Sequence, residues 1–262
     1  MNVAVVTDSA HVDEGRVLAN TLGIPFLEPG KRAMAETPYV LHLDGDGLML
    51  LSQSGATGSV GCDFIGGKLR HRHRFGGGSG QAIARAVGVK GAFIPVVADL
   101  TAGLGADAFV LAGLGATVMM VERNPVVSAL LNDGMERARL YGDDEDLLSA
   151  VGRMHLVRGD AREWLAGLDD SERPDVIYLD PMFPSRTKSA GVKKEMQVLR
   201  TLVGKDEDIA ELLEAALEKA RYRVVVKRPR LSDPLADRAP DFSVTGKSTR
   251  FDVYALNKLP GR

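Results

Sequence analysis

The stretch VIYLDPMFP, residues 176–184, decides the fold. Its first four residues are all apolar, as in a buried strand of a parallel sheet, so Asp180 and Pro181 directly follow the strand. Ligands bind at the carboxyl ends of the strands in an open α/β sheet. An acid, a backbone stiffened by proline and the ring of Phe183 together suit one task. They can hold a planar exocyclic amino group edge-on while stacking the base that carries it.

Around this stretch, apolar strands alternate with amphipathic helices, a pattern that indicates a parallel α/β sheet with right-handed crossovers. Asn124 and Pro125 make a capped helix start, and Asp206 opens another helix with apolar residues at helical spacing. The C-terminal segments 242–245 and 251–256 form a predicted hairpin. A Rossmann-like parallel sheet that ends in an antiparallel hairpin resembles the fold of class I methyltransferases, although a fold alone does not give function. The predicted core strands are residues 94–98, 117–121, 154–157, 176–179 and 223–226.

The first part of the chain predicts a small α/β subdomain. Residues 2–7 read as a strand, residues 12–22 as a helix ended by Gly23, and the DGDG run at 44–47 as the turn of a hairpin. Residues 61–80 are rich in glycine and basic residues, so we expect a connecting segment there. The predicted organisation is an N-terminal subdomain over residues 1–65, followed by the larger domain over residues 66–262.

Composition limits the classes of protein that the chain can belong to. The 262 residues are 45% hydrophobic and carry a formal net charge of -2, which suits a soluble globule and requires any nucleic-acid contact to use a local basic patch. Cys62 is the only cysteine, so neither an intramolecular disulfide nor a cysteine-built metal site is expected. With no long apolar run and no basic leader, the expected setting is the cytoplasm, away from membranes.

A glycine-rich turn after the first core strand predicts the cofactor site. Gly103 and Gly105 permit a tight turn, and a helix beginning near Ala106 directs free amide groups at a ligand. The turn also fits a relaxed dinucleotide pattern. Asp99 lies where its carboxylate can receive a methionine ammonium, whereas Asp107 at the helix start would repel a pyrophosphate. The pattern therefore favours S-adenosylmethionine over NAD.

Two further strand ends complete the predicted cofactor site. Glu122 and Arg123 end the second core strand, and an acid there can accept both ribose hydroxyls of an adenosine. Gly159 and Asp160 follow the third core strand and can receive the adenine amino group.

The residues after the fourth strand predict the chemistry. The Asp180 carboxylate and the Pro181 carbonyl are two acceptors for the two protons of an amino group, which aims the nitrogen lone pair at an electrophilic methyl. Phe183 supplies a stacking face worth about 1–3 kcal/mol per base. No strong base is required, since the nitrogen loses its proton only as positive charge develops on it. We expect methylation of a nucleobase amino group, driven by positioning and electrostatics.

Basic residues cluster in three separate places around this expected site, a pattern typical of a phosphate-binding rim. One cluster precedes the first core strand, one follows Asp180, and one ends the fifth strand. The predicted RNA-binding residues are Arg70, Arg72, Arg74, Arg186, Lys188, Lys227 and Arg228.

The segments 74–81, 99–105 and 178–184, together with 226–229 and 248–254, resemble the bacterial 16S ribosomal RNA guanine-N2 methyltransferase family. The resemblance covers about residue 39 to the C-terminus. It implies methyl transfer from S-adenosylmethionine to the N2 amino group of one guanosine, with 16S rRNA or the small ribosomal subunit as partner and no metal. Ala106 stands where the family usually has arginine, and the pair at 159–160 replaces two serines. The cofactor contacts that it implies are Ala106, Asp107, Glu122, Arg123, Gly159, Asp160 and Asp180.

Three other hypotheses remain open from the sequence. The first is amino methylation of adenine or cytosine in DNA or another RNA, although no target-recognition domain is evident. The second, an NAD-dependent oxidoreductase, rests on the glycine turn alone. The third is a non-catalytic RNA-binding module, which would tolerate the loss of the Asp180 carboxylate.

Overall fold

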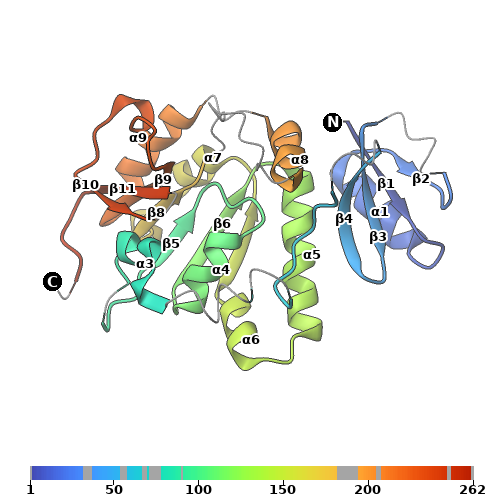
Figure 1. The fold of residues 1–262 in the computed structure, drawn as a ribbon, viewed down its shortest axis with the longest axis horizontal. Coiled ribbons are helices and arrows are strands. Elements are labelled where there is room, and N and C mark those ends of the chain that lie inside the picture. Colours follow the sequence, from blue (N-terminus) through green and yellow to red (C-terminus); the bar gives the residue numbers. More distant parts are fainter. Residues whose placement is uncertain are drawn as a thin grey trace.

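The computed structural model describes residues 2–31, 37–53, 58–66, 70, 78–89, 91–181, 194–204, 208–246 and 249–260, and only the backbone of residues 194–197 and 200. Within these ranges it contains a seven-stranded sheet and a four-stranded sheet. Figure 1 shows the smaller sheet beside the long helix α5, on the side away from the larger sheet.

The larger sheet has the strand order β10-β11-β9-β8-β5-β6-β7. Among its described strands only β11 runs against the others, pairing antiparallel with both β9 and β10. This confirms the predicted parallel sheet with an antiparallel C-terminal hairpin. The strands are β5 (Val96–Asp99), β6 (Thr117–Glu122), β7 (Met154–Arg158), β8 (Val176–Leu179), β9 (Arg223–Pro229), β10 (Phe242–Thr245) and β11 (Thr249–Ala255).

Strand β8 is buried on both faces, which explains its unbroken apolar sequence. Because side chains alternate along a strand, Val176 and Tyr178 enter one core cluster while Ile177 and Leu179 enter the other. Burial of such a side chain stabilises the fold by about 1.5–3 kcal/mol. The strand is therefore a stable platform for the residues that follow it.

Helices cover both faces of the larger sheet (Figure 1). Residues of α3, α4 and α6 join the core cluster of one face, and residues of α7 and α9 join that of the other. The helices in this part of the chain are α3 (Ala82–Val87), α4 (Ala106–Gly113), α5 (Pro125–Tyr141), α6 (Glu145–Gly152), α7 (Ala161–Ala166), α8 (Lys194–Val203) and α9 (Ile209–Lys219). Of these, α8 contributes to the core of the smaller sheet.

Helix α5 begins as the sequence predicts. Pro125 is its first residue, and the Asn124 side chain accepts hydrogen bonds from the amides of Val126 and Val127 at 3.0 and 3.2 Å. The helix contributes residues to the core of the larger sheet and also to that of the smaller one. It therefore joins the two sheets.

The smaller sheet is formed by β1 (Val3–Thr7), β2 (Phe26–Leu27), β3 (Tyr39–Asp44) and β4 (Gly47–Ser52), in the order β2-β1-β3-β4. Helix α1 (Val12–Leu22) ends at Gly23, whose φ of 62° is left-handed. The predicted helix and the β3–β4 hairpin are both confirmed. Division of the chain into domains at residue 65 stays a prediction, since the core of this sheet continues into α5.

Two element boundaries differ from the sequence prediction. Strand β5 begins at Val96 and not at residue 94, because Pro95 has no amide hydrogen to donate to a neighbouring strand. Helix α9 begins at Ile209, whereas the predicted start at Asp206 lies outside the described residues.

Gly134 in α5 lets the segment around Cys62 pack closely on the helix. A Cβ atom at Gly134 would lie 2.7 Å from the Cys62 Cβ and 2.8 Å from its carbonyl oxygen. We expect Gly134→Ala to lower the free energy of unfolding by about 1–3 kcal/mol, because the backbone of the packed segment must shift. Urea denaturation followed by circular dichroism measures this change.

Gly152, at the end of α6, provides a matched control, since no atom lies within 4 Å of a Cβ built there. Gly152→Ala should raise stability by up to about 1 kcal/mol through helix propensity. Equal stability of the two alanine variants would contradict the close packing of Cys62 on α5.

Candidate active site

A cavity of about 750 Å³ opens at the carboxyl ends of β5, β6, β7, β8 and β9. Residues in the last positions of these strands or just after them line it, as expected for a ligand site of a parallel α/β sheet. Every residue predicted from sequence to contact the cofactor lies in its wall: Asp99, Gly103, Ala106, Asp107, Glu122, Arg123, Gly159, Asp160 and Asp180.

The glycine turn between β5 and α4 needs glycine for two reasons. Gly103 and Gly105 have φ values of 55° and 71°, in the left-handed region. A Cβ at Gly105 would also come within 2.8 Å of the Leu131 side chain on α5. The turn is therefore held close to α5, with backbone facing the cavity.

The Glu122 side chain is buried, and its two oxygens are held by the backbone. One oxygen accepts from the Gly103 amide at 2.9 Å and the other from the Asn124 amide at 2.8 Å. The bond to Gly103 ties the end of β6 to the glycine turn. Together the two bonds fix the carboxylate in the cavity wall, where it can also accept from hydroxyl groups.

Asp99 is the most deeply buried acid of the cavity wall. Its side chain is 2% exposed and accepts a hydrogen bond from the Thr101 amide at 3.1 Å. Burial, together with the nearby Asp107 and Asp180, raises the pKa of Asp99 to about 8. The ligand-free protein therefore favours neutral Asp99 at neutral pH, and a bound cation would favour its ionised form.

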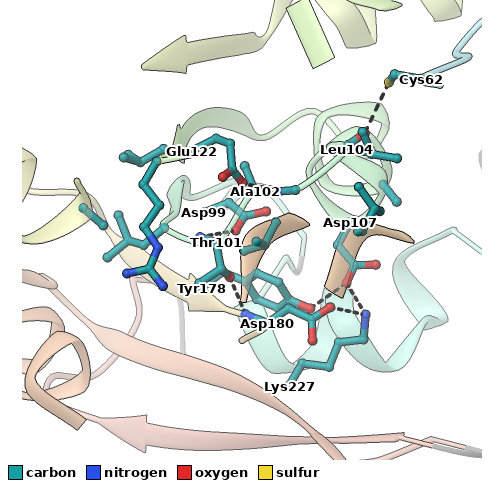
Figure 2. Close-up of a pocket in the computed structure, with 18 of the residues that line it drawn as sticks. Cys62, Asp99, Thr101, Ala102, Leu104, Asp107, Glu122, Tyr178, Asp180 and Lys227 are labelled. Atoms are coloured by element: carbon teal, nitrogen blue, oxygen red, sulfur yellow. Dashed lines mark hydrogen bonds and ion pairs between the residues drawn. The ribbon is translucent and has the colours of Figure 1, made fainter. Parts of the chain in front are cut away.

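Asp180 leaves the end of β8 and turns into the same cavity. Its amide donates to the Thr101 hydroxyl at 2.6 Å, which joins the ends of β8 and β5. Its carboxylate, with a side chain 39% exposed, forms an ion pair with Lys227 at 2.7 Å. Figure 2 shows Asp180 near Asp99 and the glycine turn, so the structure brings together the two motifs that the sequence separates by about 80 residues.

Lys227, Asp107 and Tyr178 form a hydrogen-bonded group beneath Asp180. Asp107 Oδ2 accepts from Lys227 Nζ and from the Tyr178 hydroxyl, both at 2.7 Å. Burial opposes the charge on Lys227, but Asp107 and Asp180 outweigh it and raise its pKa above the ordinary value. Burial raises the pKa of Tyr178, so its phenol remains a neutral donor.

The opposite end of the cavity has its own network of charges. Asp160 caps α7 by accepting from the Arg162 amide at 2.8 Å, and its pKa is lowered mainly by the Arg162 side chain. Arg123 pairs with Asp208 at 3.0 Å. The side chains of Arg123 and Asp160 are thus held by protein partners. A ligand at this end of the cavity can therefore contact the backbone at 159–160 more readily than these side chains.

Three of the predicted RNA contacts, Arg70, Lys227 and Arg228, have protein partners in the structure. Lys227 lies in the cavity and pairs with Asp107 and Asp180, because β9 runs beside β8 with Val226 opposite Leu179. Arg228 is 7% exposed and donates to the Asp233 carbonyl, so it is not placed to reach a phosphate.

Arg70 donates to the Ile65 carbonyl at 2.7 Å and lies 3.4 Å from both Asp143 and Asp144. The remaining predictions Phe183, Arg72, Arg74, Arg186 and Lys188 lie outside the described residues.

Sequence reasoning missed part of this site. Thr101 and Tyr178 were not assigned a role, yet both fix groups of the wall. The spacing of Tyr178 and Asp180 could have indicated that Tyr178 belongs to the site, since residues i and i+2 of an extended segment lie on the same side. The segment at 59–63 also lines the cavity, and Cys62 donates to the Leu104 carbonyl at 3.3 Å. Cys62 is buried, as predicted, and burial raises its pKa, so its thiol stays neutral.

The fold and this cavity define a class I S-adenosylmethionine-dependent methyltransferase, and comparison with known proteins supports the class. A model of the putative SAM-dependent methyltransferase family matches residues 30–256. A SAM-dependent methyltransferase from Neisseria gonorrhoeae, solved by crystallography, is 36% identical, with a TM-score of 0.74 over 96% of this chain and 95% of its own.

Two curated relatives are more similar in sequence, and both are named ribosomal RNA small subunit methyltransferase J. The protein from Thioalkalivibrio sulfidiphilus is 52% identical over 92% of each chain, and that from Cellvibrio japonicus is 47% identical over 99% of each. The chain therefore belongs to this family of SAM-dependent methyltransferases. Membership confirms the predicted fold class, enzyme class and cofactor, and removes the NAD-dependent oxidoreductase hypothesis.

The described residues contain neither a helix suited to span a membrane nor a cluster suited to hold a metal ion. None of their helices combines the length and apolar character that crossing a membrane requires. In the same part of the chain, no cluster of three or more histidine, cysteine or acidic side chains has the geometry to hold a metal ion.

Asp99 should make the stability of the ligand-free protein depend on pH. Because its folded pKa of about 8 lies above the ordinary 3.8, its contribution to stability is complete below 3.8 and is lost as the pH rises to about 8. Asparagine does not titrate, so Asp99→Asn removes this pH-dependent loss of stability. The stability of the variant relative to wild type should therefore increase with pH over this range, by up to about 1.4 kcal/mol per pH unit.

Urea denaturation at several pH values measures this difference in the ligand-free protein. A difference between Asp99→Asn and wild type that stays constant with pH would contradict a buried, proton-binding Asp99.

Proposed function

We propose that the enzyme transfers a methyl group from S-adenosylmethionine to the exocyclic N2 amino group of a guanosine in 16S rRNA. One observation carries the proposal: Asp180 and the residues of the cofactor loop line a single cavity. The family assignment and the rRNA substrate in the names of its relatives support the choice of RNA over DNA. Since ribosomes are assembled in the bacterial cytoplasm, we place the enzyme there.

The residues of the cavity fit S-adenosylmethionine. The buried Asp99 carboxyl suits the methionine ammonium, the turn at Gly103 admits the close approach of the methionine part, and Glu122 suits the ribose hydroxyls. The backbone at 159–160 suits the adenine. When bound, the cofactor supplies an electrophilic methyl on a sulfonium. The acids of the wall attract its two positive charges.

Asp180 and Pro181 bind and orient the target amino group. The carboxylate and the carbonyl accept its two N–H protons, so the nitrogen lone pair points at the methyl carbon. With the cofactor bound, the nitrogen would form a bond to that carbon as the carbon–sulfur bond breaks, and the electron pair of the broken bond would stay on sulfur. The nitrogen then releases a proton to water. Positioning and electrostatic stabilisation by Asp180 account for the acceleration. The Phe183 ring stacks on the base.

The basic residues Arg72, Arg74, Arg186 and Lys188 are proposed to bind RNA phosphates. They lie in the sequence next to elements of the site, before β5 and after Asp180. Arg70 is excluded from this set because its guanidinium contacts Ile65, Asp143 and Asp144.

Loss of the Asp180 carboxylate should abolish most activity while sparing cofactor binding. We expect Asp180→Asn to lower kcat by about 10²–10³-fold, the usual cost of losing a transition-state contact, with a cofactor Kd within a few-fold of wild type. The assay uses labelled S-adenosylmethionine with small-subunit RNA from a strain that lacks the gene, and nucleoside analysis for N2-methylguanosine. Asp170→Asn, at a side chain 96% exposed in η3 (Asp170–Glu172), is the matched control.

Wild-type protein that binds the cofactor but leaves N2-methylguanosine unlabelled would refute the guanine-N2 assignment. Full activity of Asp180→Asn would instead support a non-catalytic role for the motif.

RNA affinity should depend on salt through the basic residues. The double variant Arg72→Ala/Arg74→Ala should reduce the slope of log K against log salt by about 1 per lost phosphate contact. Arg70→Ala is the control and should keep the wild-type slope. Filter binding at several salt concentrations measures the slopes, and an unchanged slope in the double variant would contradict the assignment.

A further inference from the structure

Lys227 joins a buried acid of the fold to the acid that faces the ligand. Its Nζ lies 2.7 Å from Asp107 Oδ2 and 2.7 Å from Asp180 Oδ2. The side chain of Asp107 is 7% exposed, whereas that of Asp180 is 39% exposed. The ammonium is therefore anchored on one side to the protein interior and holds a solvent-accessible carboxylate on the other (Figure 2).

Tyr178 holds the anchor itself in place. Its hydroxyl donates to the same oxygen of Asp107 that Lys227 contacts, at 2.7 Å, and its ring is fully buried in β8. Asp107 lies in the first turn of α4, directly after the glycine turn. Strands β8 and β9 and helix α4 thus each contribute one member to the support of Asp180.

The contacts of Lys227 offset the repulsion between the acids of the site. Asp99, Asp107 and Asp180 lie close together in the cavity wall, with Lys227 as a cation beside them and Tyr178 as a neutral donor. Without the cation, like charges would favour protonation of one acid or rotation of Asp180 away from the others. A protonated Asp180 would present an O–H donor, and a rotated Asp180 would point its oxygens elsewhere. Neither could accept a hydrogen bond from an amino N–H in the required position.

We propose that Lys227 is a positioning residue for methyl transfer, which keeps Asp180 ionised and turned toward the target amino group through its anchor on Asp107 and Tyr178. The role rests on the function proposed above for Asp180. It differs from the RNA-phosphate contact that the sequence suggested for Lys227, since a phosphate contact would act on RNA affinity and a positioning contact acts on turnover.

The test measures kcat, KM for RNA, cofactor Kd and the pH profile of kcat in Lys227→Met. We expect kcat to fall by about 10²-fold, as for a misplaced reacting group, with KM and Kd within about threefold of wild type. The acidic limb of the kcat profile should move to higher pH, because Asp180 loses the cation that favours its ionised form. A purely structural lysine would not move this limb.

Two further variants control for folding. Asp107→Asn/Lys227→Met removes both buried charges together and should show the same fall in kcat with a native circular dichroism spectrum. Tyr178→Phe keeps the buried ring, removes only the hydroxyl, and should lower kcat about five- to tenfold, the value of one hydrogen bond.

A double-mutant cycle that combines Lys227→Met with Asp180→Asn tests whether Lys227 acts through Asp180. If it does, Lys227→Met should cost less than about threefold when added to Asp180→Asn. A full 10²-fold further loss, or wild-type kcat in both lysine variants, would overturn the proposal. The identity of the product tests the function separately: if the label appears on another base with the same cycle, the role of Lys227 stands and the guanine-N2 assignment falls.

Discussion

The ion pairs of Lys227 with Asp107 and Asp180 are the interaction on which the site depends. They join the end of β9, the start of α4 and the end of β8, three segments that lie far apart in the sequence. An acid on a turn with an exposed side chain has many rotamers open to it. A cation held by a buried partner restricts them, so the carboxylate is already oriented before a substrate arrives.

The charge balance of the wall follows from this arrangement. Around Asp180 the described residues place three acids, Asp99, Asp107 and Asp180, beside Lys227, and burial raises the pKa of Asp99 to about 8. Such a site suits a ligand that carries an ammonium and a sulfonium. It suits a pyrophosphate poorly, since that anion would face Asp107 at the helix start. The family of methyltransferases to which the chain belongs is consistent with this charge.

Most of the fold could be predicted from the sequence, because its signals are local. The apolar run of β8, the Asn124 cap of α5 and the turn at 44–47 each specify one element and its boundary. The nine residues predicted to contact the cofactor all line one cavity, since they lie at or just after the carboxyl ends of neighbouring strands. The side-chain partners could not be found in this way. That Lys227 turns inward depends on the register of β8 and β9, and that Arg228 is buried depends on packing between distant segments. The segment at 59–63 reads as a connection, yet it forms part of the cavity wall because Gly134 lets it lie on α5.

A crystal structure with bound S-adenosylmethionine tests the central claim most directly. We expect the ammonium within a hydrogen-bond distance of about 3 Å from Asp99, and the methyl group directed toward the Asp180 carboxylate, with the Lys227 contact intact. A cofactor bound with its methionine end away from Asp99, or its methyl turned away from Asp180, would contradict it.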